Sequence, residues 1–141
     1  MCAPQISSDK SLLEKATEDY LDKMDLAADF LELSPLGLTA VDPTGVIRYV
    51  NHGLCLMSGW DYSELIGKEV EILVPDLLKE NHKNSHRPGY GLDPRSREMN
   101  PGNPLRLRHR SGAEIPVAIQ LRPKVRAGGM LTLAWVQRLP G

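Results

Sequence analysis

The chain has 141 residues, of which 41% are hydrophobic and 25% are charged, as in an ordinary soluble domain with a single core. Its formal net charge of −1 gives no electrostatic basis for binding nucleic acid or an anionic membrane. No apolar run is long enough to span a bilayer, no secretion signal opens the chain, and two cysteines predict no disulfide framework, so we expect a cytoplasmic protein.

A helical pattern runs from residue 9 to residue 33, with Ser8 or Asp9 as its cap and Ser34-Pro35 as its end. Its apolar residues recur at spacings of three and four and form a narrow, heptad-like stripe: Leu13, Ala16, Tyr20, Met24, Ala27 and Leu31. We expect this stripe to form a homodimer. The alternative is a helix that folds onto its own domain.

A β-hairpin is predicted next, because Asp42-Pro43-Thr44-Gly45 carries the residues of a tight turn. The segments on either side, 36–41 and 46–50, are apolar and contain β-branched and aromatic residues. Asn51 then stands where a helix begins, and its side-chain oxygen can cap the N–H groups of the first turn. Gly59 is expected to end that helix.

In the second half of the chain, the sequence predicts helical segments up to residue 87 and three antiparallel strands between residues 103 and 138. The prolines and glycines between Arg87 and Gly102 predict an irregular loop. Alternation along the strands predicts one apolar set on the inner face: Leu105, Leu107, Ile115, Val117, Ile119, Leu121, Leu131, Leu133 and Trp135. With the hairpin, these three strands predict an α+β fold with five antiparallel strands and helices on one side.

Several of these signals stand in a fixed order: Asp42, Gly45, Asn51, Gly59-Trp60, Glu64-Leu65-Ile66-Gly67, Val74-Pro75 and Arg110-Ser111-Gly112-Ala113-Glu114-Ile115-Pro116-Val117. In this order they resemble the PAS domain family of bacterial signalling proteins (S-box type), although Ser111 replaces the family's usual aspartate. The resemblance covers residues 34–138 and implies the PAS fold, a five-stranded antiparallel sheet with helices on one face. We expect an N-terminal dimerisation helix (1–33), a PAS domain (34–138) and a short tail (139–141).

The resemblance implies a sensory domain that couples a small ligand or a partner contact to the flanking helix and the dimer interface. No enzyme is expected, since the phosphate-binding, Gly-x-Ser-x-Gly and His-Glu-x-x-His motifs are missing. A small hydrophobic ligand is expected between the helices and the sheet, although each lining residue fits an ordinary core equally well. The expected lining is Leu54, Met57, Trp60, Leu73, Leu78, His82, Ile115, Val117, Ile119, Leu133 and Trp135.

His82 and His86 are spaced by four and would face the same way on a helix. The first alternative function is a haem-based gas or redox sensor, because His82 matches the position of the axial histidine in haem-binding PAS domains. Against it, the Pro/Gly-rich segment after His86 departs from a subgroup that continues this helix. A divalent metal on both histidines lacks further ligands. In the third interpretation His82 is structural and hydrogen-bonds the loop.

The segment that follows His82 resembles a PAS variant found beside kinase, cyclase or phosphatase domains, so we expect an effector or partner protein. Arg87, Arg95 and Arg97 are candidates for holding an anionic ligand at the cavity mouth. The alternative pairs these arginines with nearby acids: Glu80, Asp93 and Glu98. No cofactor is obligatory; a flavin is not expected, since the reactive-cysteine motif is missing. The second alternative function is a ligand-free protein–protein interaction module.

Overall fold

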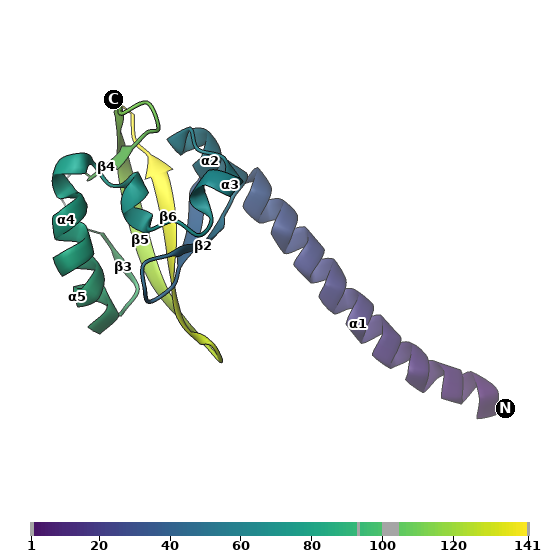
Figure 1. The fold of residues 1–141 in the computed structure, drawn as a ribbon. Helices are drawn as coiled ribbons and strands as arrows, with labels where there is room; N and C mark the ends of the chain where they lie inside the picture. Colours follow the sequence, from purple (N-terminus) through teal and green to yellow (C-terminus); the bar gives the residue numbers. More distant parts are fainter. Residues whose placement is uncertain (1, 93, 100–104, 141) are drawn as a thin grey trace. The chain divides into compact units, whose positions relative to one another are not determined.

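The computed structural model describes residues 2–92, 94–99 and 105–140. The chain divides into two units, the N-terminal helix up to Leu33 and a unit that begins at Ser34 (Figure 1). No helix in this described part of the chain is both long enough and apolar enough to cross a membrane.

Helix α1 spans Cys2–Leu33 and therefore begins before Ser8 and Asp9, so the predicted caps are wrong. Pro4 lies in the first turn of the helix, where its missing N–H costs no hydrogen bond, and it does not delay the start. The helix ends at Leu33, in keeping with the predicted stop at Ser34-Pro35. Large apolar side chains along it are exposed: Leu12, Leu13, Tyr20, Leu21, Met24, Leu26, Phe30, Leu31 and Leu33.

The second unit is built on an antiparallel sheet (Figure 1). Its strands are β1 (Gly37–Val41), β2 (Ile47–Val50), β3 (Arg97–Glu98), β4 (Leu105–Arg108), β5 (Glu114–Arg126) and β6 (Gly129–Arg138). The order is β2-β1-β6-β5, and both β3 and β4 pair with β5. The predicted five-stranded antiparallel sheet is confirmed, while the two-residue strand β3 lies in the segment predicted as a loop.

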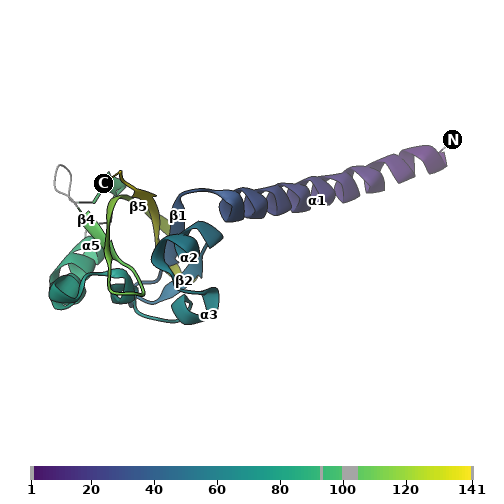
Figure 2. The same ribbon diagram turned by 90° about the horizontal axis from the view of Figure 1, so that it is seen from above.

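Short helical segments cover one face of this sheet (Figure 2). They are α2 (His52–Ser58), α3 (Tyr62–Leu65), the 3₁₀ turns η1 (Val70–Leu73) and η2 (Asp76–Leu78), α4 (Lys79–Asn81), the π-helical turn η3 (His82–His86) and α5 (Arg87–Leu92). The arrangement confirms the predicted α+β fold with helices on one side of the sheet.

Helix α5 corrects the prediction of an irregular loop after Arg87. The helix passes through Pro88 because the turn before it is π-helical: the Arg87 N–H bonds the His82 carbonyl, five residues back. A widened turn of this kind relieves the contact between a proline ring and the preceding turn. Tyr90 then anchors α5, since its side chain is buried and its hydroxyl donates to the Arg95 carbonyl at 3.0 Å.

The core lies between the helices and the inner face of the sheet. Its fully buried apolar side chains come from β2, α2, α3 and β5: Ile47, Val50, Leu54, Leu65 and Val117. Asn51 is also fully buried at the start of α2. Its Oδ1 accepts hydrogen bonds from the N–H groups of Leu54 (3.0 Å) and Leu38 (2.8 Å), which confirms the predicted helix cap and also ties α2 to β1.

Strand β6 presents the opposite residues to the core from those predicted. Val136 is buried in the core and pairs with Ile119 on the inner face of β5. Trp135 pairs with Gln120, and Leu133 pairs with Arg122, so these two side chains lie on the outer face. The prediction is wrong because β6 has apolar residues at both its odd and its even positions. Alternation alone therefore does not identify which set faces the core.

Candidate functional site

The interior between sheet and helices brings together most of the residues predicted to line a ligand pocket. Those buried in the core are Leu54, Met57, Leu73, Ile115 and Val117, and Trp60 and Ile119 pack against them. Leu78 is 54% exposed, because the single turn η2 directs it to solvent, and it is not part of this interior. Leu133 and Trp135 are excluded as well, since they lie on the outer face of the sheet.

A buried charged group, the Glu71 cluster, consists of Glu71, His82 and Arg87 on the helical layer. Glu71 is only 6% exposed. Its Oε2 lies 2.5 Å from His82 Nδ1, and its Oε1 lies 3.2 Å from Arg87 Nη2. A carboxylate this deeply buried requires such partners, because an unpaired charge in the interior is costly. The cluster therefore holds η1 against the helical run from η3 to α5.

Arg87 extends the cluster to the turn between β1 and β2. It donates to the Thr44 carbonyl and lies 3.5 Å from the Glu69 carboxylate, which also binds Lys83 at 2.9 Å. Arg87 is thus an ion-pair residue, as one interpretation of the sequence held, but its partners are Glu69 and Glu71 instead of Glu80. The turn, η1 and α5 are joined by one side chain.

The other two predicted arginines, Arg95 and Arg97, follow farther along the same segment. Arg95 is exposed, and its carbonyl accepts the hydrogen bond from Tyr90. The backbone of Arg97 pairs with Leu121, while its side chain, like that of His86, lies outside the described residues. Of the three predicted anion-binding candidates, Arg87 is brought next to the acidic groups Glu69 and Glu71.

The haem interpretation of His82 stays a prediction. Helix α5 does continue the helical run beyond His86, so the sequence argument against haem was wrong on that point. However, the His82 ring is held by the Glu71 carboxylate, with the Arg87 guanidinium on the same acid. A carboxylate on one ring nitrogen is also the usual partner of a metal-ligating histidine, and no haem chemistry is derived from this contact. Among the described residues, no group of three His, Cys, Asp or Glu side chains is placed to hold a metal ion.

Asp42 fixes the β1–β2 turn in its ionised form. Burial raises the pKa of its carboxyl, but hydrogen bonds from Thr44, Val46 and Arg48 outweigh burial and lower that pKa from 3.8 to about 2. The donors are the Thr44 hydroxyl (2.6 Å), the Val46 N–H (3.0 Å) and Arg48 Nε (2.8 Å), together with the Thr44 N–H (2.9 Å). The turn that Arg87 contacts is therefore stabilised by a charged carboxylate.

Asp42→Asn is expected to lower the free energy of unfolding at pH 7 by about 2 kcal/mol, since one pKa unit corresponds to about 1.4 kcal/mol. The folded-state pKa is depressed, so this stabilisation is fully present above the unfolded value of 3.8 and is lost as the pH falls toward 2. Urea unfolding of both proteins across this range measures the effect. A difference between them that does not shrink below pH 4 contradicts this account.

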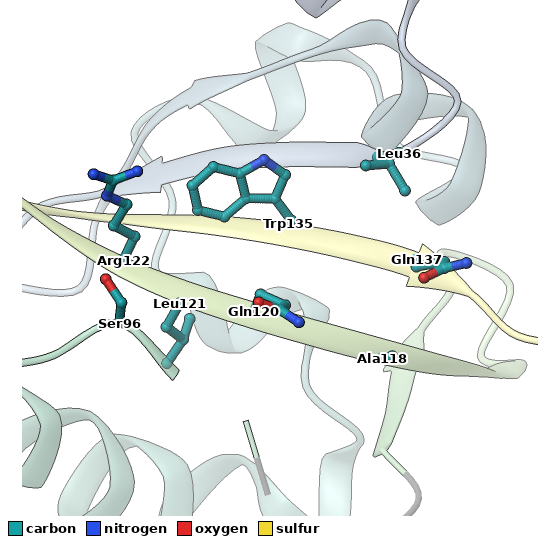
Figure 3. Close-up of a pocket in the computed structure, with 8 residues that line it drawn as sticks. All are labelled: Leu36, Ser96, Ala118, Gln120, Leu121, Arg122, Trp135 and Gln137. Atoms are coloured by element: carbon teal, nitrogen blue, oxygen red, sulfur yellow. The ribbon is translucent and has the colours of Figure 1, made fainter. Parts of the chain in front are cut away.

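The outer face of the sheet carries a shallow pocket of about 490 Å³. Figure 3 shows Trp135 between Leu36 and Arg122, with Gln120 and Ala118 along β5. Sequence analysis missed this site because it assigned Trp135 to the core. It also missed Glu71, although a lone acid within the apolar run Val70–Leu73 is the signal of a buried, paired carboxylate.

The sheet and its one-sided helical layer, with one apolar core between them, define the class of this α+β domain. Within this class, the sequence matches the family model described as PAS fold over residues 28–136. The chain therefore belongs to the PAS family, as its motifs predicted. No curated protein matches it.

Solved structures agree with this assignment. The PAS domain of an HTR-like protein from Haloarcula marismortui has a TM-score of 0.73 at 20% identity, covering 89% of this chain and 99% of that one. A domain of a sensory box sensor histidine kinase/response regulator from Geobacter sulfurreducens gives 0.66 at 14% identity, with coverages of 86% and 98%. The PAS domain of nitrogen regulation protein NR(II) from Vibrio parahaemolyticus gives 0.60 at 13%, with coverages of 81% and 98%. Identities this low support the fold alone.

Proposed function

We propose that this chain is a non-catalytic sensory domain that couples a small ligand or a partner contact to helix α1 and to a homodimer interface. The observation that carries the proposal is the junction after α1. The Asn51 amide donates to the Leu36 carbonyl at 3.0 Å, and a Cβ on Gly53 would lie 2.5 Å from that oxygen and 2.7 Å from the Ser34 carbonyl. Repacking around α2 would therefore displace the residues that follow α1.

The apolar interior is the proposed ligand site. Leu54 and Met57 on α2, with Ile115 and Val117 on β5, offer a small hydrophobic molecule an apolar surface next to the junction. We further propose that an effector or partner protein in a cytoplasmic signalling pathway receives this change; the proposal follows from membership of the PAS family, whose fold this chain shares with domains of a sensor histidine kinase and a nitrogen regulation protein. The Glu71 cluster would hold η1, α5 and the β1–β2 turn in place while α2 repacks around the ligand.

Met24→Lys is expected to raise the dissociation constant of the homodimer at least about tenfold, because it places a charge in the apolar stripe of α1. Leu21→Lys is the matched control: Leu21 is 57% exposed, close to the 53% of Met24, but lies off the stripe. Native mass spectrometry over a dilution series of the full chain measures both. Equal dissociation constants for the two variants would show that the stripe is not the dimer interface.

A ligand-free interaction module is the second candidate, because Leu54, Leu65 and Val117 are fully buried by neighbouring side chains alone. The same spectra distinguish the two. Added mass on the folded chain supports a ligand-binding sensor, and a dimer of bare chains supports the interaction module.

A further inference from the structure

The hairpin of β5 and β6 carries an unbalanced positive charge. Residues 115–141 contain four lysines and arginines and no acidic residue, which the formal net charge of −1 for the whole chain conceals. Three of these cations, Arg122, Lys124 and Arg126, stand at alternate positions of β5, so they share one side of the strand, and all three are exposed. Within the described structure none of them forms an ion pair or a side-chain hydrogen bond. This row of cations is therefore available to an anionic partner.

A row of apolar side chains on β6 runs beside these cations and is only partly buried. Each member of the apolar row faces a polar or basic residue across the hairpin: Trp135 faces Gln120, Leu133 faces Arg122 and Leu131 faces Lys124. Successive pairs repeat about every 6.8 Å along strands that lie about 4.8 Å apart. The outer face of the hairpin thus offers two parallel rows, one apolar and one basic.

The apolar row ends in the pocket of about 490 Å³ beside Trp135 (Figure 3). Gln120 and Gln137 line this pocket together with the indole ring. An indole face stacks on another planar ring, and a primary amide both donates to and accepts from the polar edge of such a ring. The pocket therefore fits a heterocyclic base better than a purely apolar or a purely anionic group.

Single-stranded nucleic acid has the chemistry of both rows. Its bases are planar rings with hydrogen-bonding edges, and its backbone carries one phosphate charge for each nucleotide. Along the hairpin, each step of two residues offers a surface for one base and, at Arg122 and Lys124, a cation for the adjoining phosphate. An anionic lipid surface would use the cations but not the amides of the pocket, and an acidic peptide would leave the indole face without a stacked ring.

We propose that the outer face of the β5–β6 hairpin binds single-stranded nucleic acid, with one base stacked on Trp135 and the following phosphates held by Arg122, Lys124 and Arg126. The inference goes beyond the proposed sensory function, because it uses neither the interior nor the stripe of α1. No particular base sequence is required, since stacking and phosphate pairing are common to all nucleotides.

The test is the dissociation constant of fluorescein-labelled octauridylate for the full chain, measured by fluorescence anisotropy at low and high salt. Trp135→Ala is expected to raise the constant at least about tenfold, because one stacked base loses its partner. Trp135→Phe keeps an aromatic ring at this position and is the matched control, with a rise of at most about threefold.

The phosphate contacts are tested by the dependence of binding on salt. Arg122→Gln with Lys124→Gln is expected to lower the slope of log affinity against log salt by about 1.4 in magnitude, since each phosphate contact to a single strand contributes about 0.7. Lys68→Gln with Lys83→Gln is the charge control, because it removes two exposed lysines from the segment between α3 and α5 and leaves the slope unchanged. Circular dichroism verifies that each variant is folded.

Two competing anions separate nucleic acid from the other possible partners. Polyglutamate and vesicles that contain phosphatidylserine are each added at the same concentration of negative charge as the octauridylate. Retention of the octauridylate against both supports the inference. Its displacement by either competitor, an unchanged dissociation constant for Trp135→Ala, or a wild-type chain that does not bind it overturns the inference and leaves the proposed ligand site and dimer untouched.

Discussion

Asn51→Leu is expected to lower the free energy of unfolding by about 4 kcal/mol, the larger of the two strongest effects that the structure predicts. Asn51 is fully buried, and its amide group bonds the Leu38 N–H, the Leu54 N–H and the Leu36 carbonyl. Leucine has the same branched shape but is larger, so the loss combines three backbone groups left without partners with overpacking of a fully buried site. Urea unfolding followed by circular dichroism measures it.

Two further variants isolate the cause. Asn51→Asp keeps an acceptor for both N–H groups but places a charged oxygen against the Leu36 carbonyl, so its loss is expected to be large at pH 7 and to shrink at low pH, where the protonated carboxyl can donate to that carbonyl. Asn84→Leu, on the exposed surface of η3, is expected to stay within about 0.5 kcal/mol of wild type. If Asn51→Leu unfolds at the same urea concentration as Asn84→Leu, Asn51 does not hold α2 to β1.

Glu71→Leu is expected to lower the free energy of unfolding by about 3 kcal/mol. The substitution leaves Arg87, whose side chain is only 17% exposed, without its buried carboxylate, and it frees the His82 ring from η1. Because one cluster joins η1, α5 and the β1–β2 turn, α5 is expected to lose its protection against hydrogen exchange first. Urea unfolding and hydrogen exchange measure the two effects.

A double-mutant cycle tests whether Glu71 acts through Arg87. Glu71→Leu combined with Arg87→Met is expected to cost at least about 1 kcal/mol less than the sum of the single changes, because neither charge is then left unpaired. Glu80→Leu, at an exposed acid of α4, is the control and is expected to be nearly neutral. Additive losses would mean that the 3.2 Å contact carries no coupling energy.

The parts of the fold that the sequence predicts correctly are those that depend on local signals. The turn at Asp42–Gly45, the cap at Asn51 and the strand alternation of β4 and β5 each depend on residues close in sequence, and the structure contains all of them. The second role of Asn51, its bond to the Leu38 N–H, was beyond sequence reasoning because it depends on how β1 meets α2.

The errors share a physical cause, which is that tertiary contacts decide between local alternatives. Strand β6 is apolar on both faces, so only its pairing with β5 shows that Trp135 lies outside the core. Pro88 enters a helix because a π-helical turn precedes it and Tyr90 is buried after it. Arg87 pairs with Glu71, which lies at the opposite end of the helical run. No spacing in the sequence indicates this partner.

The central claim is that this chain is a ligand-binding sensor that dimerises through α1. Native mass spectrometry of the purified full chain tests this claim most directly. The account predicts a dimer at high protein concentration, with mass beyond that of two bare chains from a small hydrophobic molecule in each interior. A bare monomer at every concentration, from protein purified gently enough to retain ligands, would contradict both the ligand site and the dimer.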